Sequence, residues 1–202
     1  MPAPMVKRSP DAGQDEPGSA LRAIRVRNGW TLADVSERTG LQVSVLSKLE
    51  NGKLSFSYDK LMKVSRGLNI DIAELLSPPT AQPTTRVFGR RSIARGGKGV
   101  PVDAGSYVYQ HLATDLLDKK FVPMVGVHCA TSVEEFGEMM QHPGEEFVYV
   151  LKGTLELHTS IYAPVRLEEG DSIYFDSDTP HAYISGGSEP CIVLSICSDV
   201  TD

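Results

Sequence analysis

Three side chains in the second half of the chain have the types and spacing of metal ligands. His142 and Glu146 stand four residues apart in HPGEEFVYVLKG, and His181 follows a proline in GDSIYFDSDTPH. Two imidazoles and one carboxylate make a facial triad that suits Fe(II), with Mn, Ni and Zn as further candidates. Such a triad leaves coordination positions for water or a small molecule. We therefore predict a divalent metal site at these residues; the alternative is that the histidines only form hydrogen bonds in an empty pocket.

A second set of polar side chains lies in TLADVSERTGLQVSVLSKLENG, at residues 31–52. In the major groove of DNA, glutamine can pair with adenine, lysine with guanine and serine with several bases. We predict DNA contacts from Gln42, Val43, Ser44, Ser47 and Lys48, and also from Thr31, Arg38 and Lys53, with Arg22, Arg25 and Arg27 as further candidates for phosphate contacts. The alternative for each is a solvated surface residue. Residues 19–66 together carry 9 basic and 4 acidic side chains, which favours DNA binding.

The elements that must position these polar side chains are short helices. Apolar residues recur at helical spacing between residues 19 and 76, interrupted by Asn28-Gly29, Gly40 and Asn51-Gly52. Thr31 and Asp34 have the spacing of a capping box, and a glycine at position 40 ends that helix after two turns. We expect five helices, with Glu50 paired to another side chain of the bundle.

This segment resembles the Xre/lambda-repressor-type family of helix-turn-helix DNA-binding domains over residues 19–76. The residues that carry the resemblance are Thr31, Val35, Gly40, Leu46, Ser47, Leu49, Glu50, Gly52, Leu61 and Leu75. The resemblance implies a five-helix bundle in which the helix after Gly40 enters the major groove and presents its N-terminal residues to base edges.

From residue 105 the chain changes to short apolar runs separated by glycine, proline and aspartate. Many short strands with turn signals between them predict a β-sandwich or barrel. The runs are SYVYQHL, FVPMVGVHC, EFVYVLKG, TLELHTS, DSIYFDS, HAYIS and CIVLSIC. The helical pattern that we expect in this part is a brief one near Asp115–Leu117.

At residues 142–153 and 170–181 the chain resembles the cupin family, a double-stranded β-helix related to jelly rolls. His142, Glu146 and Gly153 match the first motif of that family, and Gly170 and His181 match the second. Met140 stands where the family motif places its first histidine. The expected fold class is α + β in two domains, an N-terminal five-helix lambda-repressor-like bundle and a C-terminal double-stranded β-helix, the cupin jelly-roll barrel.

Charge is distributed unevenly along the chain. The net charge of −6 combines +2 in residues 1–80, +5 in residues 81–102 and −13 in residues 103–202. Because DNA affinity comes largely from phosphate neutralisation, the acidic part is a poor DNA partner. We divide the chain into a disordered tail (1–18), a helix-turn-helix DNA-binding domain (19–76), a linker (77–104) and a cupin sensor domain (105–202). Within the linker we expect one strand, at residues 86–88.

The order of the two domains resembles a bacterial family of transcriptional regulators. This resemblance implies sequence-specific binding of a homodimer to double-stranded operator DNA and a small-molecule effector in the cupin domain. The acidic cupin favours a neutral or cationic effector on electrostatic grounds. A cupin that senses nothing and only dimerises the DNA-binding domains is a simpler alternative.

An enzyme is the second hypothesis. The same three ligand positions resemble those of hydroxypropylphosphonate epoxidase, a mononuclear non-haem iron cupin enzyme. Its substrate is a dianion, and residues 103–202 hold only 4 basic side chains. We therefore expect a regulator without catalytic residues.

The remaining sequence features favour a cytoplasmic protein. No run of 18 apolar residues predicts a membrane span, and the N-terminus lacks the apolar stretch of a secretory signal. Cys129, Cys191 and Cys197 show no CxxC spacing. Free thiols in a reducing cytoplasm are therefore expected.

Overall fold

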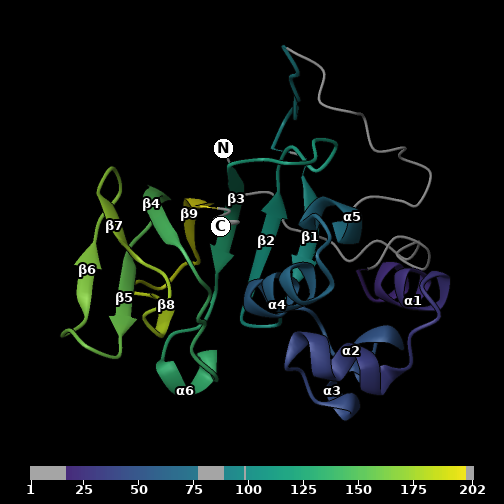
Figure 1. Cartoon of the computed structure of the whole chain (residues 1–202). Coiled ribbons are helices and arrows are strands. Elements are labelled where there is room, and N and C mark those ends of the chain that lie inside the picture. Colours follow the sequence, from purple (N-terminus) through teal and green to yellow (C-terminus); the bar gives the residue numbers. More distant parts are fainter. Residues whose placement is uncertain (1–16, 77–88, 98, 199–202) are drawn as a thin grey trace.

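The computed structural model describes residues 17–76, 89–97 and 99–198 (Figure 1). Residues 1–16 of the predicted disordered tail lie outside this part of the chain, as does the strand predicted at residues 86–88. The last two residues of that predicted tail, Pro17 and Gly18, begin the first helix instead. Proline suits the first turn of a helix because its missing N–H would have no partner there. In the described residues no helix is long and apolar enough to cross a membrane.

Five helices form the N-terminal bundle, as predicted. They are α1 (Pro17–Arg27), α2 (Leu32–Thr39), α3 (Val43–Glu50), α4 (Tyr58–Leu68) and α5 (Ile72–Leu76). The predicted capping box is present at the start of α2, where the Asp34 amide donates to Thr31 and the Thr31 amide donates to the Asp34 carboxylate. Gly40 ends α2 in the left-handed conformation at φ 71°, a backbone angle that a residue without a Cβ adopts freely.

Two contacts fix the helices of the bundle against one another. The guanidinium of Arg25 in α1 donates two hydrogen bonds to the Glu50 carboxylate at the end of α3, at 2.7 and 2.9 Å. Glu50 is therefore a structural pair, as expected. In α4, a Cβ on Gly67 would lie 2.5 Å from the Arg38 carbonyl oxygen and 2.7 Å from the Thr39 Cα. The backbones of α2 and α4 thus touch at Gly67.

The C-terminal part is built of antiparallel strands. They are β1 (Val100–Asp103), β2 (Tyr107–His111), β3 (Phe121–His128), β4 (Glu145–Lys152), β5 (Leu155–Thr159), β6 (Val165–Leu167), β7 (Ser172–Asp176), β8 (His181–Ser185) and β9 (Cys191–Ser198). A six-stranded sheet has the order β1-β2-β3-β9-β4-β7, and a three-stranded sheet has the order β6-β5-β8. All seven predicted apolar runs are strands, and the two-sheet arrangement agrees with the predicted double-stranded β-helix.

Three details of the predicted secondary structure are wrong. β1 lies within the predicted linker, because its backbone pairs with all of Val108–His111 in β2 although its own sequence, VPVD, is short and contains a proline. No helix forms at Asp115–Leu117, where the chain makes turns. The short helix α6 (Val133–Phe136) stands elsewhere, with the Ser132 hydroxyl accepting a hydrogen bond from the Glu135 amide. The spacing of that serine and glutamate is a capping signal in the sequence.

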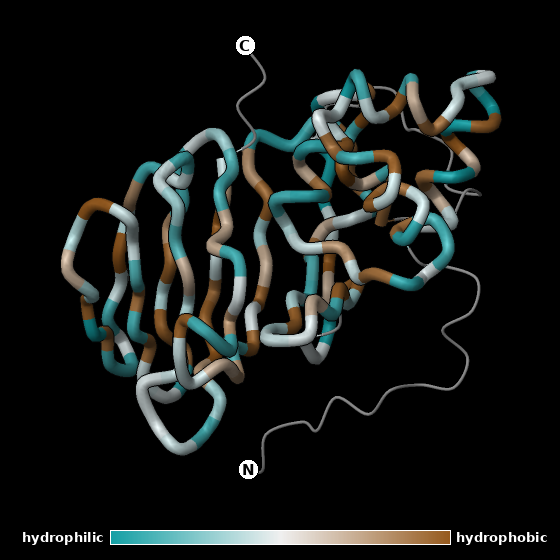
Figure 2. The backbone as a smooth tube through the Cα atoms, turned by 90° about the horizontal axis from the view of Figure 1, so that it is seen from below, coloured by the Kyte–Doolittle hydropathy of each residue, from teal (hydrophilic) through white to brown (hydrophobic). Residues whose placement is uncertain are grey.

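Side chains alternate between the interior of the barrel and its outer surface. In β9 the buried positions are Cys191, Val193, Ser195 and Cys197, and the residues between them are half-buried. The same two-residue period places hydrophobic residues at intervals along the strands (Figure 2). Polar side chains also point inward, and they gather where β2, β3, β4 and β8 meet.

The helical bundle packs against the barrel through α4 and α5, which lie beside β1 and β2 (Figure 1). The buried apolar side chains of both parts belong to a single cluster that extends from Leu21 in α1 to Cys197 in β9. Away from that cluster, the Asp118 amide donates a hydrogen bond of 2.6 Å to the carboxylate of Asp71 at the start of α5. The two parts therefore share a buried boundary.

Two buried histidines in the barrel make stability depend on pH. Burial lowers the pKa of His111 and of His128 to about 3, with Lys119 lowering the first further and Glu146 opposing the shift of the second. Unfolded histidines titrate near 6.5. Below that pH the unfolded chain binds protons at these positions while the folded chain does not, so acid favours unfolding.

We expect the free energy of unfolding to fall by about 1.4 kcal/mol per histidine for each pH unit below about 6.5. Urea titrations of the metal-free protein between pH 7 and pH 5 would measure this slope. His111→Asn should reduce the slope, whereas Gln110→Asn, a change of a non-titrating side chain in the same strand, should leave it unchanged. An unchanged slope in His111→Asn would contradict the buried neutral state.

Candidate metal centre and DNA interface

The three predicted metal ligands come together between the two sheets. Glu146 is the second residue of β4 in the larger sheet, and His181 is the first residue of β8 in the smaller one. His142 lies in the loop before β4, where its amide donates a hydrogen bond of 3.0 Å to the Ser177 carbonyl. One ligand atom from each residue can be chosen so that all three lie within 4.8 Å of one another. The fold therefore forms a group that can hold a metal ion.

The geometry of this group suits a cation. Glu146 Oε2 lies 3.3 Å from His142 Nε2 and 3.7 Å from His181 Nε2. All three residues are at most 2% exposed. The Nδ1–H of His181 donates to the Thr179 carbonyl at 2.8 Å, because a carbonyl oxygen can only accept. This bond fixes the tautomer and leaves the Nε2 lone pair facing the carboxylate, the arrangement that metal-bound histidines use.

Burial and neighbouring charges shift the pKa values of Glu146 and His181. Burial alone would raise the pKa of Glu146, but the hydrogen bond and charge of His142 and the charge of His181 outweigh it and hold the pKa below its ordinary value. Burial lowers the pKa of His181, against the opposing charge of Glu146. A metal ion binds the carboxylate in its ionised form and each imidazole in its neutral form, so an incoming cation would take the place of the histidine protons beside Glu146.

Met140 stands directly beside the metal ligands, as its place in the family motif predicts. Its amide donates to the His181 carbonyl at 2.8 Å, and the His181 amide donates to the Met140 carbonyl at 2.9 Å. The side chain is buried. The backbone at position 140 is hydrogen-bonded to that of His181, so a histidine side chain there would lie next to one of the three proposed ligands.

The polar residues of α3 face outward. Leu46 and Leu49 are buried in the bundle, which leaves the opposite face of the helix for solvent. Gln42, Val43, Ser44 and Lys48 are exposed, and Ser47 is half-buried. Val43 is among the exposed large hydrophobic residues, a placement that would suit contact with a thymine methyl group. These five residues lie at the N-terminus and along one side of a two-turn helix.

The other DNA candidates lie in different surroundings. Thr31 is exposed, but its hydroxyl already takes part in the capping box of α2. Lys53 is exposed just after α3. Arg38 stacks over the Trp30 ring, 4.6 Å from its centroid, and lines a cleft that faces the barrel. Arg25, also a candidate for phosphate contact, is instead held by the carboxylate of Glu50.

The cleft between the bundle and the barrel escaped the sequence analysis. It encloses about 500 Å³ and joins α2 and α4 to the loops around the metal ligands. Its walls include Arg38, Asp59, Lys63 and Arg66 from the helices and Gln141, His142 and Asp178 from the barrel. Neither segment shows a signal for this contact, since it depends on the packing of two parts that are distant in the sequence.

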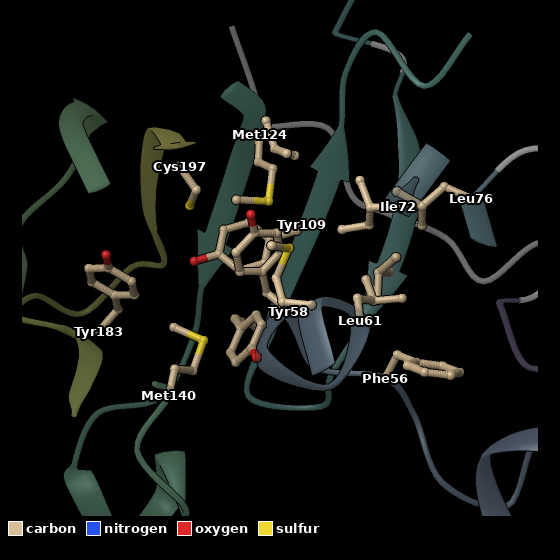
Figure 3. Close-up of a cluster of buried hydrophobic side chains, with 14 of the residues drawn as sticks. Phe56, Tyr58, Leu61, Ile72, Leu76, Tyr109, Met124, Met140, Tyr183 and Cys197 are labelled. Atoms are coloured by element: carbon tan, nitrogen blue, oxygen red, sulfur yellow. The ribbon is translucent and has the colours of Figure 1, made fainter. Parts of the chain in front are cut away.

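Tyr58 is a residue whose contact with the proposed metal site has no signal in the sequence. It is the first residue of α4, and its ring packs edge-on against the His142 ring with centroids 4.7 Å apart. A residue of the helical bundle thus touches a predicted metal ligand. Figure 3 shows Tyr58 in one cluster with the barrel residues Tyr109, Met124 and Met140. Only the three-dimensional structure brings these residues together.

Comparison with known proteins supports both halves of this description. The family model described as "Helix-turn-helix" matches residues 21–75, and the one described as "Cupin domain" matches residues 131–197. Among solved structures, an HTH_3 family transcriptional regulator from Vibrio cholerae superimposes with a TM-score of 0.62 at 19% identity, covering 93% of this chain and 97% of that one. The hydroxypropylphosphonic acid epoxidase from S. wedmorenis gives a TM-score of 0.48 at 19% identity, which carries no argument about chemistry.

Curated relatives cover nearly the whole chain. The HTH-type transcriptional regulator SutR of Escherichia coli is 24% identical over 85% of this chain and 88% of its own length. The HTH-type transcriptional regulator PuuR of the same organism is 24% identical over 92% of this chain and 96% of its own length. These relatives favour a regulator over the iron enzyme. The chain therefore has an Xre-like helix-turn-helix domain followed by a cupin domain, and over most of its length it is similar to HTH-type transcriptional regulators.

Proposed function

We propose that this protein regulates transcription by binding an operator through α3 and a small effector at a metal centre in the cupin domain. The observation that carries the proposal is the pairing of an exposed polar helix with a buried, ionised His-Glu-His group in one chain. The helix has the groups for reading bases, and the buried group has donors for a cation with open coordination positions. An effector would change DNA affinity through the difference between its affinities for the free and the DNA-bound forms.

For DNA binding, we propose the roles that each residue type allows. Gln42, Ser44, Ser47 and Lys48 would contact base edges, and Val43 would contact a thymine methyl group. Thr31, Arg38 and Lys53 would contact the phosphate backbone. The bundle supplies these contacts while the cupin domain, with a net charge of −13 in residues 103–202, repels phosphate.

Replacing Ser44, Ser47 and Lys48 together with alanine should weaken binding to the promoter of the protein's own gene by about 100-fold, since a good base contact contributes ~1–3 kcal/mol. A mobility-shift titration against unrelated DNA of equal length would measure the loss of specificity. Lys120→Ala removes one exposed charge from the cupin domain and should change little. Tight, specific binding by the triple variant would contradict the proposed role of α3.

For the metal, we propose that His142, Glu146 and His181 hold one divalent ion, with Fe, Mn, Ni and Zn as candidates. The ion would act as a Lewis acid that binds a donor atom of the effector. The residues of the chain bind and orient it: the Thr179 carbonyl sets the His181 tautomer, and Glu146 supplies the negative charge. The resulting site would accept a neutral or anionic donor atom, whereas the net charge of −13 in residues 103–202 favours a neutral or cationic molecule. A neutral effector would meet both conditions.

Met140→His should strengthen metal binding by at least about tenfold, because it adds a fourth donor beside His181. His142→Ala should weaken binding by at least about 100-fold, more than the loss of an outer-shell partner costs. Elemental analysis and competition with a chelating dye would measure both effects, with His158→Ala as the surface control. A metal content unchanged in His142→Ala would remove the basis of the proposed site.

We also propose that the protein is a homodimer formed through the open edge of the barrel. One helix-turn-helix reads only half of a two-fold operator, and dimers place two recognition helices about 34 Å apart. Where β6 and β7 end the two sheets, Ile161, Tyr162, Val165 and Tyr174 are exposed. Beside them an apolar groove of about 340 Å³ runs along Leu157, Ile173 and Phe175. An exposed apolar patch of this kind suits a second copy of the chain.

Tyr174→Glu should convert the dimer into a monomer, since a charge buried in an apolar interface without a partner is strongly unfavourable. Light scattering at micromolar concentration, with and without DNA, would measure the mass. Phe121→Glu places the same charge at an exposed hydrophobic residue in β3 and should leave the mass unchanged. A wild-type protein that is monomeric under both conditions would rule out the dimer.

A further inference from the structure

Tyr58 belongs to the helical bundle but its side chain lies inside the cupin. The residue begins α4, directly after the helix cap at Ser57, and is 2% exposed. Its ring meets His142 edge-on at 4.7 Å and stacks with His111 at 6.0 Å between centroids. His111 ends β2 and His142 precedes β4, so the ring contacts two segments that are distant in the sequence. The Tyr58 side chain therefore covers His142, one of the three proposed metal ligands, from the side of the helical bundle.

Polar atoms without hydrogen bonds gather behind this ring. Within the described residues, both ring nitrogens of His111 and of His128, Nδ1 of His142 and Oε1 of Glu146 have no hydrogen-bond partner. Buried polar atoms in folded proteins are almost always paired with protein or with water. A cluster of this size points to a polar occupant, such as a small molecule with its accompanying water.

The charges of the site restrict that occupant. Glu146 would provide one negative charge, and histidine binds a metal ion as the neutral imidazole. A divalent ion at the triad would leave a net charge of +1. The open coordination positions would therefore accept a monoanion or a neutral donor.

A route to the triad runs along the domain boundary. The cleft of about 500 Å³ is lined by His142 on the barrel side and by Asp59 and Met62 of α4 on the helical side. Asp59 follows Tyr58 in the same turn. A molecule in this cleft would contact His142 and the first turn of α4 together.

We infer that Tyr58 is a residue of the effector site and acts as its lid. A ligand that takes an open position at the metal displaces the Tyr58 ring, and the displacement moves the first turn of α4. This inference rests on the proposed metal centre. It adds that the DNA-binding domain itself closes the ligand site, so that occupancy and the position of that domain change together.

The probe for the test is azide, a monoanionic metal ligand, titrated into the Co(II)-loaded full-length protein and followed by visible absorption. Tyr58→Ala should bind azide about tenfold more tightly than the wild type, because displacing the two ring contacts costs about that factor. Tyr58→Phe keeps the ring and should behave like the wild type. Phe121→Ala removes an exposed aromatic ring in β3, away from the site and the proposed dimer interface, and is the control.

Hydrogen exchange of the Co(II) protein provides a second readout, which does not depend on azide affinity. Azide should raise the exchange of the amides in the first turn of α4, and in Tyr58→Ala it should cause no further rise. Equal azide affinity in the wild type and Tyr58→Ala, or no change in exchange in the wild type, would overturn the lid while leaving the metal centre intact. Failure of Co(II) to bind through His142 would instead overturn the metal proposal together with this inference.

Discussion

The burial of the Glu146 carboxylate is the constraint on which the rest of the site depends. A charge that is 1% exposed in the interior of a barrel is strongly unfavourable unless opposite charge or hydrogen-bond donors surround it. The nearest such groups are His142 and His181, which reach it from different sheets and are themselves buried. A cation between them would satisfy all three residues at once. The barrel therefore has to close accurately enough to bring β4 and β8 together at this point.

Charge also separates the tasks of the two domains. The basic side chains gather in the helical bundle and the segment that follows it, whereas residues 103–202 carry a net charge of −13. Phosphate attraction therefore comes from the helical part of the chain, and the acidic barrel is repelled by the DNA backbone. Side chains of both charges line the boundary between the domains: Arg38 and Arg66 lie on the helical side and Asp178 lies on the barrel side. A ligand at that boundary would contact side chains of both domains.

Local signals in the sequence predicted most of the elements and which three side chains gather in the barrel. The capping box at Thr31, the left-handed turn at Gly40 and the strand runs all depend on neighbours within a few residues, and each is present in the structure. The ligand triad was predictable because its residue types and motif spacing are distinctive. Its geometry was not, since the distances depend on the pairing of β4 with β7 and β9 and on the position of β8 in the other sheet.

Features that depend on contact between distant segments escaped prediction. β1 is a strand because β2 offers it a partner, although a proline and a short apolar pattern argue against one. Arg25 has the charge of a phosphate contact, but the carboxylate of Glu50 lies within 2.7 Å and holds it. Tyr58 is the first residue of a helix, and nothing near it in the sequence indicates that its ring reaches His142.

The backbone contact at Gly67 has a mechanical consequence. Because no side chain separates α4 from α2 there, the two helices move as one stiff unit, and neither can slide past the other without a clash. α4 spans 11 residues, which corresponds to a rod of about 16 Å. A tilt of about 10° at the tyrosine end would shift the far end of such a rod by about 3 Å, close to the ~3.4 Å rise of one base pair along DNA. A displacement of that size would be enough to move a reading helix out of step with its bases.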